Sequence, residues 1–444
     1  MINRIFKSTG FSVLCIKILS SVSGFFLAAV IARATISDVV GQFFLANSIV
    51  SMLGVFGIFG LNQVASKSIS KHLTYEDLYE AKSQAKLITV ASLFVSLLTS
   101  ALYMLVTNTI YFNGSGWGGE SSKNYGLMVI WLVLCVLQTL QVEIYRAHRK
   151  VTFSSLFGGL IATTITILLI VGFNFIYGQM KLQELLLLSV SGIFAQVVLG
   201  YWFSEGIFWN NESFRFFDIC KVLKQGLPML MIAIFGFVAT QSGIFLVSHF
   251  ATPGELANYA VAAKLANLTN FVSAIFYALL PPIIVKMDIK NDFTTLEKLL
   301  KGCAAINTLI MMPFFISVVF FPKGLLALVF GQGYADGDHI LIIVALGNFV
   351  NLVTGIRGYV LILTGHHRVQ MAITILSACL TMLLGYICGI FYGGIGVIVG
   401  VTISTIFQCI IELAAVKKYK KINTSIWMVG KESIYTSWIF LNER

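Results

Sequence analysis

Long apolar stretches, each bounded by charged or turn-forming residues, recur along the whole chain. A helix needs about 20 apolar residues to cross the hydrocarbon of a bilayer, and windows of that length predict about twelve spans. They cover residues 10–32, 40–62, 86–107, 125–145, 153–176, 184–204, 226–248, 256–284, 300–321, 339–364, 369–391 and 394–415. The pattern therefore predicts an all-α polytopic membrane protein.

Composition supports this class and excludes a soluble globular enzyme. Of the 444 residues, 57% are hydrophobic and only 11% are charged, and the mean hydropathy is +0.88. An average soluble domain is about a quarter charged, so this chain could not cover a water-facing surface. The seven cysteines are scattered without a CxxC pair, which indicates neither a disulfide framework nor a metal site.

The formal net charge of +11 follows from membrane topology. Lysine and arginine concentrate in alternate connecting segments, and basic loops are retained in the cytoplasm. The opposite set of segments carries only Arg33, Lys123, Lys181 and Lys323. We therefore expect both termini to be cytoplasmic, and the charge gives no support for a nucleic-acid partner.

A weak internal repeat predicts two related halves. The stretch Ala34–Phe43 after the first span resembles Ala251–Tyr259 after the seventh, with Asp38 paired with Glu255. Many transporters are built from two such halves. The predicted domains are an N-terminal six-helix bundle over 1–222, a C-terminal bundle over 223–416 and a cytoplasmic, partly interfacial tail over 417–444.

Three basic residues lie well inside predicted spans: Lys17, Lys264 and Arg357. Insertion scales put a lysine or arginine at the bilayer centre at about 2.5–3.5 kcal/mol, so such residues usually face a wet cavity or a partner. The alternative for each is that its side chain reaches the nearest interface. Together they are candidates for a cationic substrate-binding cavity.

Polar residues accompany each cation at helical spacing, where positions three or four apart share a face. The candidate cavity-lining residues are Ser20, Asn47, Gln241, Asn267, Asn270, Asn348, Asn351 and Thr354. Glu143 and Glu412 are placed near helix ends, so no acid is expected deep in a span. The expected interior is therefore net cationic and attracts an anionic ligand, and without a buried carboxylate, downhill flux is favoured over proton coupling.

Motifs for covalent or metal chemistry are not found in the sequence. It contains no Walker A motif, no zinc pattern and no nucleophile elbow, so we expect no catalytic residue, no metal and no cofactor. Gly396 and Gly400 form a GxxxG pair, which predicts a close helix contact.

Several local motifs suggest a family. They are Lys17 through Phe25, Ile31-Ala32-Arg33, Gly41-Gln42-Phe43, Gly60-Leu61-Asn62 and Phe330-Gly331-Gln332-Gly333-Tyr334. With the topology, they resemble the polysaccharide-transport (Wzx-type) branch of the MATE-like (MOP) exporter superfamily. The resemblance implies two six-helix bundles around a central cleft with a cationic lumen, matched here by Lys17, Lys264 and Arg357.

The same resemblance implies a function. Its members move undecaprenyl-pyrophosphate-linked oligosaccharide, such as an O-antigen repeat unit, from the cytoplasmic to the periplasmic leaflet of the bacterial inner membrane. The implied partners are this lipid-linked sugar, the phospholipid bilayer and the polysaccharide polymerase machinery.

Two other functions stay open from the sequence. A cation-coupled drug or metabolite exporter of the same fold would need an acidic site within the spans. A membrane-embedded polysaccharide polymerase would need catalytic groups on a sizeable external loop, and the external loops of this chain are short.

Overall fold

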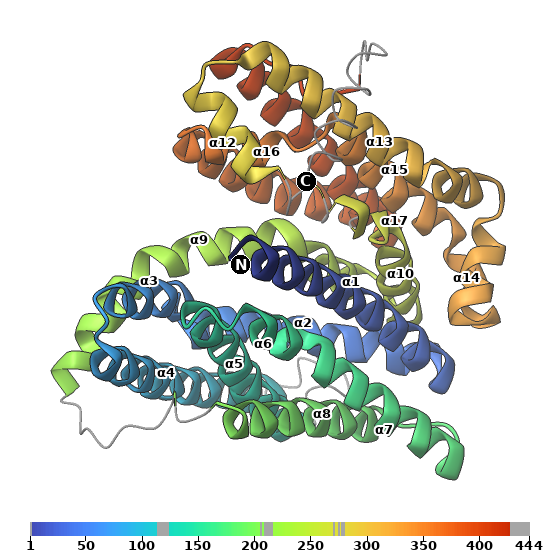
Figure 1. The fold of residues 1–444 in the computed structure, drawn as a ribbon. Helices are drawn as coiled ribbons and strands as arrows, with labels where there is room; N and C mark the ends of the chain where they lie inside the picture. The colour runs from blue at the N-terminus through green and yellow to red at the C-terminus, as the bar shows by residue number, and fades with distance from the viewer. Residues whose placement is uncertain are drawn as a thin grey trace. The chain divides into compact units, whose positions relative to one another are not determined.

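The computed structural model describes residues 2–112, 124–204, 207, 216–269, 271–273, 276 and 280–426. Throughout this part the chain forms helices and turns, and it contains no strand (Figure 1). The chain divides by its contacts into two compact units, Met1–Phe237 and Val238–Arg444. The predicted all-α fold is therefore confirmed; the predicted domain limits and the central cleft stay predictions.

The N-terminal unit consists of long apolar helices joined by short turns. Its elements are α1 (Ile2–Ala34), α2 (Ser37–Ile58), α3 (Leu61–Thr74), α4 (Leu78–Phe112), α5 (Tyr125–Ala147), α6 (Val151–Ser155), the π-helical turn η2 (Leu156–Leu160), α7 (Ile161–Tyr177), α8 (Leu182–Trp202) and the first part of α9 (Phe216–Phe250). Helix α5 packs against α2, α3, α4 and α8, and α1 packs along α7. Helix α5 is therefore the central packing element of this unit.

The C-terminal unit has the remaining helices. Its elements after α9 are α10 (Pro253–Ala266), α12 (Pro281–Ile289), α13 (Phe293–Phe320), α14 (Pro322–Phe330), the 3₁₀ turn η3 (Gln332–Gly337), α15 (Asp338–Thr354), α16 (Arg357–Leu363) and α17 (His367–Lys420). Helix α15 packs against α10, α13 and α17. It has the same place in the packing of this unit that α5 has in the other.

The junctions that suggested the repeat are also alike in the structure. Helix α1 ends at Ala34 and α2 begins at Ser37, with Asp38 in its first turn. Helix α9 ends at Phe250 and α10 begins after two residues, with Glu255 in its first turn. An acid in the first turn favours both helices, because the amino end of a helix carries partial positive charge. The shared junction and the shared packing order support two related halves.

Ten helices of the described part are long and apolar enough to cross a membrane. One of them, α17, has 54 residues and reverses direction at Gly393, where φ is +61°. It therefore contains both spans expected at 369–391 and 394–415, which we name the first and second arms of α17. The expected span 339–364 is broken between α15 and α16, and the expected span 256–284 lies partly outside the described residues.

The two arms of α17 pack closely where the GxxxG pair was predicted to make a helix contact, and this prediction is confirmed. A Cβ atom on Gly400 would lie 2.6 Å from the carbonyl oxygen of Leu384, and one on Gly396 would clash with the carbonyl oxygen of Cys388. Because both obstacles are backbone atoms of the first arm, no side chain could move to make room. Glycine at these positions lets the arms approach each other.

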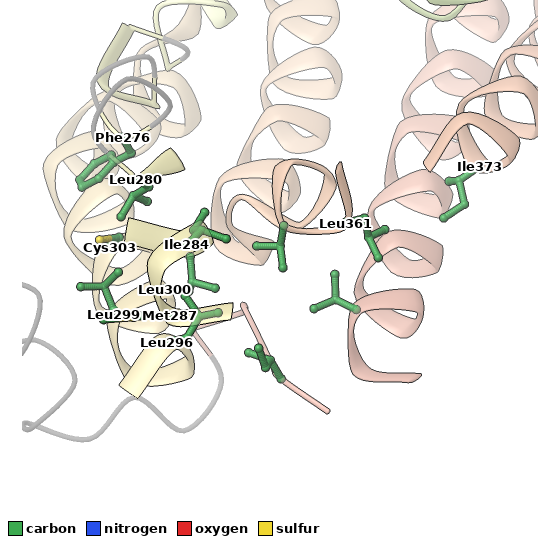
Figure 2. Packing of buried hydrophobic residues seen from close by; sticks show 13 residues of the cluster. Phe276, Leu280, Ile284, Met287, Leu296, Leu299, Leu300, Cys303, Leu361 and Ile373 are labelled. Carbon is green, nitrogen blue, oxygen red and sulfur yellow. The ribbon is translucent and has the colours of Figure 1, made fainter. Parts of the chain in front are cut away.

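A buried apolar cluster fixes α16 within the C-terminal unit (Figure 2). Val360 and Leu361 of α16 belong to the same cluster as Ile284 of α12, Leu300 of α13 and Ile373 of α17. Full burial of a side chain of this size contributes about 1.5–3 kcal/mol. Because this packing holds α16 from several sides, the first residue of α16, Arg357, has a defined position.

The packing of the α17 arms gives a stability prediction. We expect Gly396→Ala to lower the stability of the protein by about 1–3 kcal/mol, because the added methyl group forces the two backbones apart. Thermal unfolding of purified protein in detergent measures this loss. Gly172→Ala in α7 is the matched control, because a Cβ there meets nothing within 4 Å; an equal effect of both variants would contradict the close contact.

Candidate functional site

The break between α15 and α16 creates a densely hydrogen-bonded polar site in the described part of the C-terminal unit. Helix α15 ends at Thr354, Gly355 adopts a left-handed φ of +74°, and α16 begins at Arg357. A helix leaves its last four carbonyl groups without partners inside the helix. In an apolar unit these groups need partners from elsewhere in the protein.

Each of these four carbonyl groups of α15 has a partner. The Asn351 oxygen accepts from Arg357 Nη1 at 3.2 Å, and the Leu352 oxygen accepts from the Gly355 backbone N–H at 3.2 Å. The Val353 oxygen accepts from the Ile426 backbone N–H at 3.1 Å, and the Thr354 oxygen accepts from Thr424 Oγ1 at 2.9 Å. Arg357 and the segment after α17 thus complete the end of α15 together.

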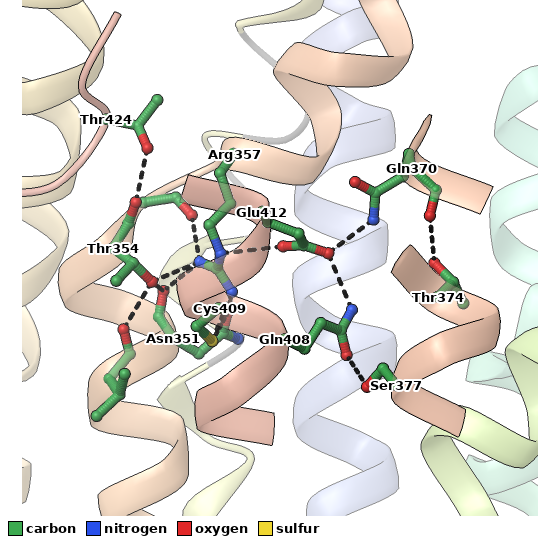
Figure 3. Close-up of polar contacts among 12 residues, drawn as sticks. Asn351, Thr354, Arg357, Gln370, Thr374, Ser377, Gln408, Cys409, Glu412 and Thr424 are labelled. Carbon is green, nitrogen blue, oxygen red and sulfur yellow. Dashed lines mark hydrogen bonds and ion pairs between the residues drawn. The ribbon is translucent and has the colours of Figure 1, made fainter. Parts of the chain in front are cut away.

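The guanidinium group of Arg357 folds back onto this helix end (Figure 3). Nη1 donates to the Gly355 carbonyl oxygen at 2.9 Å and to Thr354 Oγ1. Nη2 donates to Asn351 Oδ1 at 2.8 Å and to Cys409 Sγ at 2.7 Å. A cation is favoured there, because the carboxyl end of a helix carries partial negative charge.

Arg357 also has an acidic partner, which corrects the expectation drawn from the sequence. Its Nε lies 3.0 Å from Glu412 Oε2, and the two side chains are 5% and 6% exposed. Glu412 was placed near a helix end, but α17 continues to Lys420, so Glu412 lies about two turns inside it. The expectation of an interior without a buried carboxylate is therefore wrong, and so is the expectation that Arg357 lacks an acidic partner.

Two glutamines hold the carboxylate of Glu412. Its Oε1 accepts from Gln370 Nε2 at 2.7 Å and from Gln408 Nε2 at 2.9 Å. Gln408 Oε1 in turn accepts from Ser377 Oγ at 2.8 Å. These residues were not singled out in the sequence, although the spacing of four between Gln408 and Glu412 places both on one face of the second arm.

A partly open pocket of about 280 Å³ lies beside this ion pair. Asn351, Arg357, Gln370, Gln408 and Glu412 all line it. Gln370 Oε1 is buried and has no hydrogen-bond partner among the described residues. We name these five residues, with Thr354 and Cys409, the Arg357 site.

A second polar feature of the same unit joins α10 to α15. Lys264 and Asn267 are three residues apart at the end of α10, and both are exposed. Asn348 Nδ2 donates to Asn267 Oδ1 at 3.4 Å, and Asn348 lies three residues before Asn351 on α15. We name Lys264, Asn267 and Asn348 the polar track; it leads along α15 toward the Arg357 site.

The candidate residues of the N-terminal unit are less connected. Lys17 is exposed on α1, and the Ser20 carbonyl oxygen accepts from Ser23 Oγ, which shares a hydrogen bond with Thr163 of α7 at 2.8 Å. Asn47 is half-buried on α2. This face of α1 therefore contacts α7 at Ser23.

The other candidates are Gln241 and Asn270. Gln241 is exposed on the part of α9 that belongs to the C-terminal unit, and Asn270 lies outside the described residues. The structure thus joins Asn351, Thr354 and Arg357 in one site and Asn267 with Asn348 in another. Within the described ranges, no three His, Cys, Asp or Glu side chains converge as metal ligands would.

The buried ion pair predicts a large difference between single and paired substitutions. Removing one partner of a buried pair costs about 3–5 kcal/mol, because the other charge is left uncompensated. We expect Arg357→Ala to destabilise the protein by this amount in reversible unfolding in mixed micelles. The double variant Arg357→Met with Glu412→Gln has neither charge and should recover most of the lost stability. If it is destabilised as much as Arg357→Ala, the uncompensated charge is not the cause of the destabilisation.

Comparison with known proteins gives one family match. The profile of the family described as polysaccharide biosynthesis protein matches residues 121–337. No curated protein sequence matches the chain.

Several solved structures are similar over nearly the whole chain. A multidrug resistance MATE family transporter of the MOP superfamily, in an inward-facing conformation, has a TM-score of 0.70 at 13% identity and covers 93% of this chain and 98% of its own. The lipid II flippase MurJ, in an inward closed conformation, has a TM-score of 0.68 at 15% identity and covers 96% of this chain and 90% of its own. A MOP superfamily transporter from Pyrococcus furiosus is described as having a binding pocket of reverse polarity. It has a TM-score of 0.62 at 13% identity and covers 93% of this chain and 95% of its own.

Because these solved structures are at most 15% identical to the chain, they establish its fold alone. The family match is a similarity in sequence over residues 121–337. The chain is a multi-pass α-helical membrane protein whose fold is that of the MATE transporters and the MurJ flippase, and its residues 121–337 are similar to the family described as polysaccharide biosynthesis protein.

Proposed function

We propose that this protein is a flippase that moves undecaprenyl-pyrophosphate-linked oligosaccharide, an O-antigen or similar repeat unit, from the cytoplasmic to the periplasmic leaflet. The family match points to polysaccharide biosynthesis, and the fold is shared with a structure described as a lipid II flippase. The observation that carries the proposal is the polar track, in which exposed Lys264 precedes a hydrogen-bonded pair of asparagines.

The chemistry of such a substrate matches this arrangement. Its polyprenyl tail is apolar and can remain among the acyl chains, whereas its sugar pyrophosphate is wet and anionic and cannot cross the hydrocarbon unaided. A lysine offers up to three N–H donors to phosphate oxygens, and asparagine side chains both donate to and accept from sugar hydroxyls. We assign phosphate contact to Lys264 and sugar contact to Asn267 and Asn348.

Lys17 is a second candidate for phosphate contact, because it is exposed on a helix of the N-terminal unit. Alternating access by movement of the two halves is the mechanism usual for transporters built from repeats. The proposed location is the bacterial inner membrane with both termini in the cytoplasm. The proposed partners are the lipid-linked sugar, the phospholipid bilayer and the polymerase machinery that uses the product.

A cation-coupled drug or metabolite exporter is the second candidate, and one observation favours it. Glu412 is a buried acid within α17, which is the kind of group that an exporter of cations needs. Its carboxylate, however, already has Arg357 as counter-charge. Efflux of a cationic dye from vesicles that contain the purified protein, driven by a proton or sodium gradient, would favour the exporter over the flippase.

The flippase proposal predicts a selective effect of Lys264. We expect Lys264→Ala to reduce surface polysaccharide by at least about tenfold at normal protein level, because the anionic head loses a charged contact worth about 1.5–3 kcal/mol. Lys264→Arg should retain most activity. The amount of surface polysaccharide is measured in cells that depend on this protein for export, and the amount of each variant in the membrane is quantified in parallel.

Lys290→Ala is the matched control, because Lys290 is an exposed lysine at the end of α12, away from the polar track. It should leave surface polysaccharide unchanged. Full export by Lys264→Ala would remove the polar track from the proposed function.

A further inference from the structure

We propose that the Arg357 site binds a phosphate-type oxyanion, and that Glu412 is a built-in counter-ion which the ligand replaces. The proposal deepens the proposed function, since it rests on that function for the source of the ligand, the pyrophosphate of a lipid-linked sugar. Every residue that carries it belongs to the C-terminal unit. It assigns Glu412 a role that the charge pattern of the sequence did not suggest.

The groups around Glu412 already form an oxyanion site. The side-chain amides of Gln370 and Gln408 donate to one carboxylate oxygen at 2.7 and 2.9 Å, and Arg357 Nε lies 3.0 Å from the other as an ion pair without a hydrogen bond. A phosphate can accept from the same two amides and pair with the same guanidinium cation, whose Nε–H is left without a hydrogen bond by the carboxylate. The carboxylate therefore occupies the place of a phosphate.

The adjoining pocket makes an exchange of anions feasible. It is partly open and has a volume of about 280 Å³, which exceeds several times the roughly 30 Å³ that one water occupies in the liquid. A phosphate group can enter and the displaced carboxylate can remain hydrated. Gln370 Oε1, which lines the pocket without a partner among the described residues, is then available to accept from a water or a sugar hydroxyl.

An internal counter-ion changes both stability and selectivity. An arginine buried without a counter-charge is costly in an apolar unit, and Glu412 removes that cost while no ligand is bound. A ligand displaces Glu412 only if its interaction free energy with Arg357 is more favourable than that of the carboxylate. The difference between the two interaction free energies sets how far the exchange goes. Weak anions are thereby excluded, whereas a pyrophosphate with further contacts on the lipid or sugar gains enough to bind.

The test measures binding of inorganic pyrophosphate to the purified full-length protein in nanodiscs by calorimetry. We expect Glu412→Gln to bind pyrophosphate about tenfold more tightly than the wild type, within the usual range of coupling between sites, because the competing charge is absent. The double variant Arg357→Met with Glu412→Gln should not bind. Glu143→Gln is the matched control, because Glu143 pairs with exposed Arg146 on α5 at 2.7 Å, and its binding should equal that of the wild type.

Folding of each variant is checked by size exclusion and melting temperature. If Glu412→Gln does not fold, Glu412→Asp replaces it, because the shorter acid retreats from Arg357 and should also tighten binding. A folded Glu412→Gln or Glu412→Asp protein that binds pyrophosphate no more tightly than the wild type overturns the proposal, as does binding by the double variant.

Two nanodisc compositions distinguish the sources of phosphate. Binding that is equal in phosphatidylcholine discs and in discs with added phosphatidylglycerol supports the pyrophosphate of the lipid-linked sugar as ligand. Binding that is weakened by phosphatidylglycerol supports a phospholipid headgroup in the same oxyanion site. Because export is not the readout, full export by Lys264→Ala would remove the polar track from the proposed function and leave this measurement unaffected.

Discussion

A charge buried in an apolar membrane unit must find its counter-charge and its hydrogen-bond partners within the protein. In the C-terminal unit this requirement is met by the ion pair between Arg357 and Glu412. The pair connects the start of α16 to the second arm of α17, and the other nitrogens of Arg357 contact the end of α15. The consecutive helices α15 and α16 are therefore joined to the distant second arm of α17 through one side chain.

The segment after α17 depends on the same helix break. Ile422 is buried in the apolar cluster that holds α16, and Thr424 and Ile426 bond to the last carbonyl groups of α15. A side chain on Gly355 would meet the Thr424 carbonyl oxygen at 2.6 Å, so the break admits this segment only because residue 355 is glycine. A continuous helix through 339–364 would satisfy these carbonyl groups itself, but it would move Arg357 away from Glu412. The broken helix thus places Arg357 beside Glu412.

Much of this architecture could be predicted from the sequence, because membrane crossing imposes a length and an apolar composition that are local properties. The all-α class, most of the spans and the close contact at Gly396 and Gly400 follow from such patterns, whereas the break of the expected span 339–364 does not. Arg357 stood out for the same reason, as a charge within an apolar stretch. Its partner could not be found in this way, because the apolar window ended the last span near residue 415, whereas α17 continues to Lys420.

The remainder of the site depends on tertiary structure that no local pattern contains. Gln370 and Gln408 meet at Glu412 only because α17 reverses at Gly393 and brings its two arms together. Asn267 meets Asn348 only because α10 packs against α15. A spacing of three or four predicts which residues share a helix face, but it does not predict which face of another helix lies opposite.

Lys264 and Arg357 show why a charge within a span is an incomplete guide to function. Both were equivalent in the sequence, yet Lys264 is exposed and Arg357 is buried, with an acid and four other residues around it. The ammonium group of Lys264 is exposed to an incoming anion, whereas the guanidinium group must first exchange its carboxylate. If both contact the same lipid-linked pyrophosphate, the polar track provides the first contact and the Arg357 site the more selective one. Because affinity differences appear mainly in the dissociation rate, the competing carboxylate of Glu412 would speed release of the ligand from the Arg357 site.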